Sequence, residues 1–188
     1  YYSDDLGKSW MRGIQIKNPQ KAVTQEPGVV ELNNSRLLLF CRTSSGTQFL
    51  SYSDDQAITW TPLRPSNIKS PLSPASIERI PSTGDLLLLW NNNYAPDKRG
   101  GRRTPLNLAI SNNEGESWSK IKTLENGIYG WYCYTAIDFV EDYILLGHCA
   151  GDTKNYGGLE TTQITRLSLD WVYQDGIESP VVSYDKNG

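Results

Sequence analysis

The sequence contains few of the residues that build metal or redox centres. It has one histidine, His148, and three cysteines in 188 residues. Cys41, Cys133 and Cys149 are odd in number and lack the spacing of zinc ligands. We therefore expect neither a disulfide framework nor a metal site, and no cofactor is implied.

Long apolar runs and an excess of positive charge are also missing. No hydrophobic stretch approaches 18 residues, so we expect no membrane insertion. The formal net charge of −3 argues against nucleic acid or an anionic membrane surface as the main partner. The chain starts on Tyr1 without an initiator methionine, and we read it as a piece from which targeting information is missing.

One short motif is present three times, and it predicts the architecture. Each copy reads Ser-x-Asp/Asn-x-Gly/Ala-x-x-Trp, at 3–10, 53–60 and 111–118. A period of 50 to 60 residues indicates one supersecondary unit stacked on itself. The Asp or Asn side chain can fold the chain into a tight turn, and glycine at the fifth position supplies a positive φ. Ala57 replaces that glycine in the second copy, at an expected cost of about 1 kcal/mol. The tryptophan is expected to fill the gap between neighbouring sheets.

Three β-hairpins lie between these turns, at 26–42, 73–91 and 134–149. A third strand follows each hairpin, at 47–52, 105–110 and 161–167. Four antiparallel strands per unit make a propeller blade, so the sequence predicts an all-β propeller. The expected domain is 1–188, divided into the end of a preceding blade and three further blades, at 1–17, 18–68, 69–126 and 127–188.

The expected strand register places polar residues at one end of the hairpins. It puts Glu26 opposite Arg42, and Tyr134 opposite His148 within one residue. The second hairpin places Ser73 or Pro74 across from Asn91 or Asn92. In a propeller these equivalent ends converge towards the axis, so we expect them to face one cavity.

On these motifs the chain resembles the sialidases (neuraminidases) and their BNR-repeat relatives, which are six-bladed propellers carrying such Asp boxes. The resemblance extends over essentially the whole chain and includes the phrases at 103–106 and 131–134. It implies that Tyr134 is the nucleophile, that Glu26 is its base, and that Arg42 and Arg103 bind the substrate. Arg102 is the alternative to Arg103, and Tyr132 is the rival of Tyr134.

Two family elements have no counterpart in this sequence. The first arginine of the family's triad and its aspartic acid–base both belong to blades that precede Tyr1. His148 and Cys149 stand where many sialidases place an acidic residue, which leaves specificity open.

The resemblance implies retaining hydrolysis of a terminal sialoside, with a sialylated glycan or another acidic sugar as substrate. Two alternatives stay open: a carbohydrate-binding or structural propeller without catalysis, and a hydrolase for a different acidic sugar. Taken singly, Glu26 and Arg42 also fit a surface ion pair, Tyr134 fits packing between blades, and Arg103 fits a solvated loop. A secreted or periplasmic location follows from the resemblance alone, and the oligomeric state is unknown.

Overall fold

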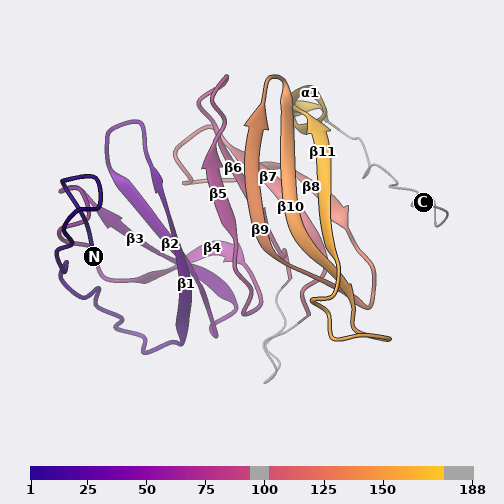
Figure 1. Cartoon of the computed structure of the whole chain (residues 1–188), viewed down its shortest axis with the longest axis horizontal. Coiled ribbons are helices and arrows are strands. Elements are labelled where there is room, and N and C mark those ends of the chain that lie inside the picture. The colour runs from indigo at the N-terminus through magenta and orange to yellow at the C-terminus, as the bar shows by residue number, and fades with distance from the viewer. Residues whose placement is uncertain (94–101, 176–188) are drawn as a thin grey trace.

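Three separate antiparallel sheets follow one another along the chain in the computed structural model, which describes residues 1–93 and 102–175 (Figure 1). The first sheet contains β1 (Thr24–Glu31), β2 (Leu37–Thr43), β3 (Thr47–Ser53) and β4 (Arg64–Lys69). The second contains β5 (Ser76–Arg79), β6 (Leu86–Trp90), β7 (Leu106–Ser111) and β8 (Ser119–Glu125). The third contains β9 (Gly130–Val140), β10 (Tyr143–Asp152) and β11 (Thr162–Ser168), followed by the short helix α1 (Leu169–Tyr173). The predicted order of hairpin and third strand is confirmed in each sheet.

The second sheet is covered on both faces, and its middle strand shows why. All five residues of β6 are buried. Because side chains alternate along a strand, Leu86 and Leu88 pack into a core shared with the first sheet, while Leu87 and Leu89 pack into a core shared with the third. Burial on both faces explains the uninterrupted apolar run at 86–90.

The Asp boxes fold as the predicted tight turns. In the first, the Ser3 hydroxyl and the Asp5 carboxylate both accept backbone N–H groups, from Gly7 and Ser9 respectively, at 2.8 Å each. The other two copies repeat this pattern, with Ser53 and Asp55 in one and Ser111 and Asn113 in the other. The Ser9 hydroxyl also donates to the Asp5 carboxylate, at 2.7 Å, and the hydrogen bonds from Ser9 hold the pKa of Asp5 down at about 2.

Ala57 occupies the left-handed region, with φ of 71°, as the motif predicts. The residue before it is also left-handed in every copy, which the sequence did not indicate: Leu6, Gln56 and Glu114 have φ of 60°, 57° and 59°. Trp60 and Trp118 pack against cores as expected, whereas Trp10 is 64% exposed.

Each sheet therefore has two distinct ends. The Asp boxes and the β1–β2 and β9–β10 turns lie at one end, where the arrowhead of β9 points in Figure 1. Glu26 and Tyr134 lie near the start of their strands, at the opposite end. The innermost strands β1, β5 and β9 of successive sheets contact one another.

Neither a membrane-spanning helix nor a metal-binding cluster occurs in the described part of the chain. No helix within 1–93 and 102–175 is long and apolar enough to cross a bilayer. Over the same residues, no three His, Cys, Asp or Glu side chains gather where a metal ion could bind.

Candidate functional site

Glu26 and Arg42 form an ion pair at the open end of the first hairpin. Arg42 Nη2 lies 2.8 Å from Glu26 Oε1, and Arg42 Nη1 donates to the Leu72 carbonyl at 3.1 Å. Arg42 is 8% exposed, whereas the Glu26 side chain is 38% exposed. A buried guanidinium is thus fixed beside a carboxylate that solvent can reach.

The register at this point differs from the expected one. Arg42 pairs with Gln25, and the ladder shifts before Gly28 pairs with Phe40. Glu26 sits in the resulting bulge with a φ of 51°. Pro27 explains the irregularity, because proline has no N–H to donate to the ladder. The expectation that Glu26 lies directly opposite Arg42 was therefore wrong in register, although the side chains meet.

Tyr134 lies in a second bulge, at the equivalent end of the third sheet. Gly147 pairs with Ala136 and Cys149 with Cys133, which leaves Tyr134 and Thr135 facing His148 alone. The φ of Tyr134 is also 51°. The Tyr134 side chain is exposed, and Ser76 of β5 holds the neighbouring Thr135 by a hydrogen bond to its carbonyl at 2.7 Å.

Tyr132 and Tyr134 do not share a face, although residues two apart on a regular strand would do so. Tyr132 is 8% exposed and belongs to the core between the second and third sheets, whereas Tyr134 is 50% exposed. Burial is the main cause that raises the pKa of the Tyr132 hydroxyl. Because the bulge interrupts the alternation of side chains, only Tyr134 is accessible to a ligand.

Arg103 stacks on Tyr134. Its guanidinium carbon lies 5.4 Å from the centre of the Tyr134 ring and 4.8 Å from that of Trp131. Arg103 is 9% exposed, and its Nη1 is buried without a hydrogen-bond partner among the described residues. Arg102 is exposed. The position of Arg103 beside Tyr134 fits the role expected for it better than that of Arg102 does.

A series of polar contacts runs from the Glu26–Arg42 ion pair towards Arg103, which stacks on Tyr134. The Leu72 carbonyl accepts from Arg42, and the adjacent Ser73 donates to the Asn91 side chain at 2.6 Å. Asn91 in turn donates to the Pro105 carbonyl at 3.1 Å, two residues after Arg103. No hydrogen bond joins Glu26 to Tyr134 in the part of the chain that the structure describes.

His148 and Cys133 are buried close to the residues of the candidate site. His148 is 2% exposed, and its ring packs edge-on against Tyr132 with centroids 6.1 Å apart. Cys133 is also buried, and burial raises the pKa of its thiol while the adjacent Arg103 guanidinium opposes that rise. The Cys133 thiol therefore lies in the interior near Arg103, whereas the adjacent Tyr134 is exposed.

Sequence reasoning missed two features of this site. Trp131 stacks on Arg103. Its position in the segment 131–134, which carries part of the family resemblance, could have indicated that it belongs to the site. The bulge at Glu26 could have been inferred from Pro27, because proline within a sheet is confined to edges and bulges, but no residue next to Tyr134 indicates the second bulge.

A family model described as the BNR repeat-like domain matches residues 1–146 of the chain. Among solved structures, the chain superposes on the NanB sialidase from Streptococcus pneumoniae with a TM-score of 0.70 and 21% identity. That match covers 89% of this chain and 27% of the sialidase.

Two further structures show the same likeness. The intramolecular trans-sialidase from Ruminococcus gnavus gives a TM-score of 0.71 at 22% identity, covering 93% of this chain and 38% of that one. A protein of unknown function from Dyadobacter fermentans gives 0.67 at 18% identity, covering 88% and 44%. The chain thus spans less than half of each of these proteins, and its three sheets correspond to part of a sialidase-type propeller.

Proposed function

The chain belongs to the BNR repeat-like family, and from the geometry of its site we propose that it carries part of the active site of a sialidase-type glycoside hydrolase. Tyr134 is the nucleophile, Glu26 the base that activates it, and Arg42 and Arg103 bind the carboxylate of the sugar. The substrate is a glycan ending in sialic acid.

The chemistry of the substrate accounts for these residue types. A sialic acid carries a carboxylate on its anomeric carbon, which would repel an aspartate or glutamate nucleophile. A neutral phenol avoids that repulsion but requires a base, because it ordinarily ionises near pH 10. Arginine is the side chain whose planar fork matches a carboxylate.

The two half-reactions follow from these roles. Glu26 accepts the phenolic proton as the Tyr134 oxygen attacks the anomeric carbon, and the bond to the leaving alcohol breaks. Water then attacks the anomeric carbon and gives one proton to the acid that was deprotonated in the first step. The bond between Tyr134 and the sugar breaks, Glu26 returns its proton to the Tyr134 oxygen, and sialic acid leaves with retained configuration. An acid supplied by another blade protonates the leaving alcohol in the first step.

One observation carries this proposal. Glu26 and Tyr134, the base and the nucleophile, are both accessible to solvent and lie at matching ends of their sheets, and both have a left-handed backbone conformation. Each stands beside a buried arginine with a nitrogen that lacks a hydrogen-bond partner among the described residues, Arg42 Nε and Arg103 Nη1. Unpartnered buried donors are costly unless a ligand pairs with them. An anionic sugar carboxylate would provide that partner. Backbone strain of this kind gathers at functional sites.

The test is release of sialic acid from an aryl sialoside by the parent protein that contains this chain. Tyr134→Phe should reduce turnover at least about a thousandfold, because the variant has no nucleophilic oxygen. Tyr132→Phe is the matched control and should keep turnover near that of the parent, since its ring lies in the core.

Full activity of Tyr134→Phe would refute the nucleophile assignment. If the parent releases no sialic acid but binds sialylated glycans, the protein is a carbohydrate-binding propeller. Hydrolysis of another acidic glycoside, with sialosides left intact, would keep the roles of the residues and change the substrate.

A further inference from the structure

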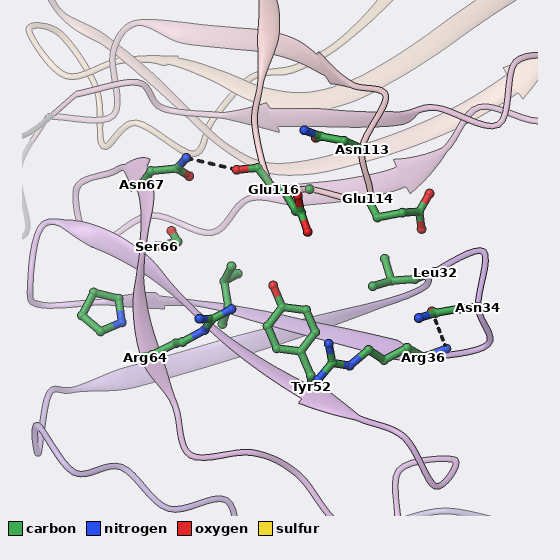
Figure 2. Close-up of a pocket in the computed structure, with 13 residues that line it drawn as sticks. Leu32, Asn34, Arg36, Tyr52, Arg64, Ser66, Asn67, Asn113, Glu114 and Glu116 are labelled. Atoms are coloured by element: carbon green, nitrogen blue, oxygen red, sulfur yellow. Dashed lines mark hydrogen bonds between the residues drawn. The ribbon is translucent and has the colours of Figure 1, made fainter.

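A groove of about 650 Å³ lies between the first and second sheets, at the Asp-box end of the molecule (Figure 2). One wall consists of β3, β4 and the β1–β2 turn, and the other is the Asp-box turn between β7 and β8. This volume falls within the roughly 300–1,000 Å³ of small-molecule sites.

The groove is remote from Glu26. Leu32, which lines it, follows Glu26 by six residues along an extended strand. At about 3.3 Å per residue, this separation is about 20 Å. A ligand in the groove would therefore occupy a site distinct from the one that contains Tyr134.

Two arginines converge on one tyrosine in the first wall. The guanidinium carbons of Arg36 and Arg64 lie 4.4 Å and 5.2 Å from the centre of the Tyr52 ring. Figure 2 shows the guanidinium groups on either side of Tyr52, whose hydroxyl points towards the opposite wall. Because cations already flank the ring, a flat ligand has no free aromatic face on which to stack.

The charge of Arg64 is uncompensated. Arg36 Nε lies 3.0 Å from Asp54 Oδ1. Arg64 is exposed and takes part in none of the ion pairs found within residues 1–93 and 102–175. Its fork of donors is thus available to a carboxylate.

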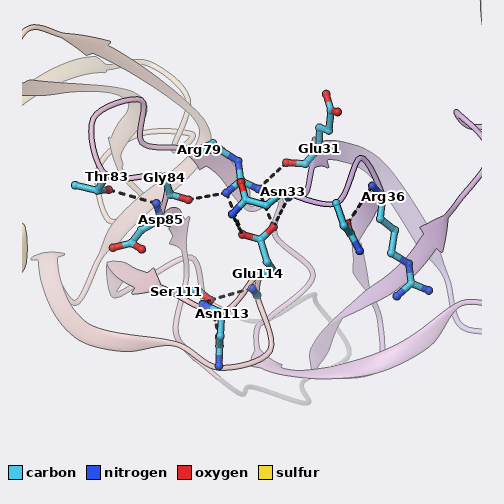
Figure 3. Close-up of polar contacts among 12 residues, drawn as sticks. Glu31, Asn33, Arg36, Arg79, Thr83, Gly84, Asp85, Ser111, Asn113 and Glu114 are labelled. Atoms are coloured by element: carbon cyan, nitrogen blue, oxygen red, sulfur yellow. Dashed lines mark hydrogen bonds and ion pairs between the residues drawn. The ribbon is translucent and has the colours of Figure 1, made fainter.

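The second wall is held rigidly by Glu114. Its carboxylate accepts from Arg79 Nη2 at 2.9 Å and from both the backbone N–H and the side chain of Asn33, at 2.8 Å each (Figure 3). Arg79 also donates to the Glu31 and Gly84 carbonyls, at 2.8 Å and 2.6 Å. These contacts bind the Asp-box turn of the second sheet to the β1–β2 turn of the first, so the two walls keep a fixed spacing.

Glu116 is the acceptor that remains open on this wall. Its side chain is exposed and has no ion-pair partner among the described residues. The Asn67 side chain donates to the Glu116 carbonyl in a long contact of 3.5 Å, and its amide oxygen is a further acceptor among the groups that line the groove. Carboxylate and amide oxygens accept from sugar hydroxyls.

We propose that this groove binds a carboxylated saccharide, with its carboxylate on Arg64 and its hydroxyl groups on Glu116 and Asn67. The ligand must combine a single negative charge with several hydroxyl donors, because the walls present an open guanidinium on one side and an open carboxylate on the other. A doubly charged phosphate would meet repulsion from Glu116, and an apolar ligand would leave these charges unsolvated. The site does not depend on whether Tyr134 is catalytic.

The test is a titration of the isotope-labelled protein with D-glucuronic acid, N-acetylneuraminic acid, lactose and sodium sulfate, followed by backbone amide chemical shifts. We expect saturable shifts at Tyr52, Arg64 and Glu116 with at least one of the two sugar acids, and none there with lactose or sulfate. Because each amide reports its own site, these shifts are read separately from any at Glu26 and Tyr134.

Arg64→Gln should weaken binding in the groove about tenfold or more, which corresponds to the loss of a charge-assisted pair. Arg166→Gln is the matched control, because Arg166 is also exposed and stacks on a tyrosine, Tyr143, at 4.6 Å in the third sheet. It should leave the affinity unchanged. Glu116→Gln should weaken sugar binding while the amide spectrum stays that of the folded protein.

The proposal is overturned if neither sugar acid shifts the groove amides, or if lactose shifts them equally. Equal saturable shifts with sulfate would also overturn it, since the groove would then be an unspecific anion site. Shifts confined to Glu26 and Tyr134 would support the proposed active site and refute the groove.

Discussion

Glu26 and Tyr134 share one backbone conformation, a left-handed φ of 51° within a bulge of the innermost strand of their sheets. For residues other than glycine, such conformations cost about 1–3 kcal/mol each and persist only where the surroundings impose them. Here the surroundings are the Arg42 pair in one sheet, and the Arg103 stack together with the Ser76 hydrogen bond to Thr135 in the other. The bulges expose the two residues that the proposed reaction uses.

The strain at Glu26 can be measured by comparing Glu26→Gly with Glu26→Ala. Both variants lose the ion pair with Arg42, but only glycine adopts a positive φ without a steric penalty. We expect the glycine variant to have a free energy of unfolding about 1 kcal/mol higher than the alanine variant, from urea denaturation. Equal stabilities would show that the backbone at this position is relaxed.

The same reasoning predicts a stabilising change in the second Asp box. Ala57 has a φ of 71° where the other two boxes have Gly7 and Gly115, both at 82°. Ala57→Gly should raise the free energy of unfolding by about 1 kcal/mol. The reverse change, Gly115→Ala, should lower it by a similar amount, since the cost is the positive φ and the added Cβ would meet Leu38 at an ordinary contact distance of 3.4 Å. A destabilised Ala57→Gly would contradict this account.

The Asp boxes should make the fold sensitive to acid. Hydrogen bonds, chiefly from Ser9, lower the pKa of Asp5 from 3.8 to about 2, and those from Thr59 lower the pKa of Asp55. A lowered folded-state pKa contributes stability that is present above the unfolded value and is lost as the pH falls through the folded value. Stability should therefore decline as the pH falls from about 5 towards about 2.

Asn113 shows that asparagine can replace the aspartate of an Asp box, because it accepts the same backbone hydrogen bond without a charge. Asparagine variants therefore provide the control for this pH dependence. The double variant Asp5→Asn, Asp55→Asn should keep its turns and lose much of the decline, as measured by urea denaturation at several pH values. An unchanged decline would assign the acid sensitivity to other carboxylates.

Arg79 and Glu114 should contribute to stability as a coupled pair. Their side chains are 24% and 31% exposed, and the 2.9 Å ion pair joins β5 to the β7–β8 turn within the second sheet. A double-mutant cycle with Arg79→Met and Glu114→Gln should give a coupling energy of about 1 kcal/mol in thermal or urea unfolding. Additive effects of the two changes would show that Arg79 and Glu114 do not stabilise the protein as a pair.

Local patterns were sufficient for much of the fold. The Ser, Asp and Gly positions of the Asp boxes specify turns through contacts within a few residues, and alternating apolar residues specify strands. The three hairpins and the strand that follows each of them were likewise predicted from such patterns. These features depend on neighbours in sequence, so the sequence alone determined them.

The tertiary structure decided which residues form the candidate site. Tyr132 and Tyr134 look equivalent in sequence, and only the bulge opposite His148 buries the first and exposes the second. Arg103 is separated from Tyr134 by thirty residues of chain, yet it stacks on its ring because the second and third sheets pack together. Contacts between sheets depend on packing across the whole molecule, which no local pattern of residues encodes.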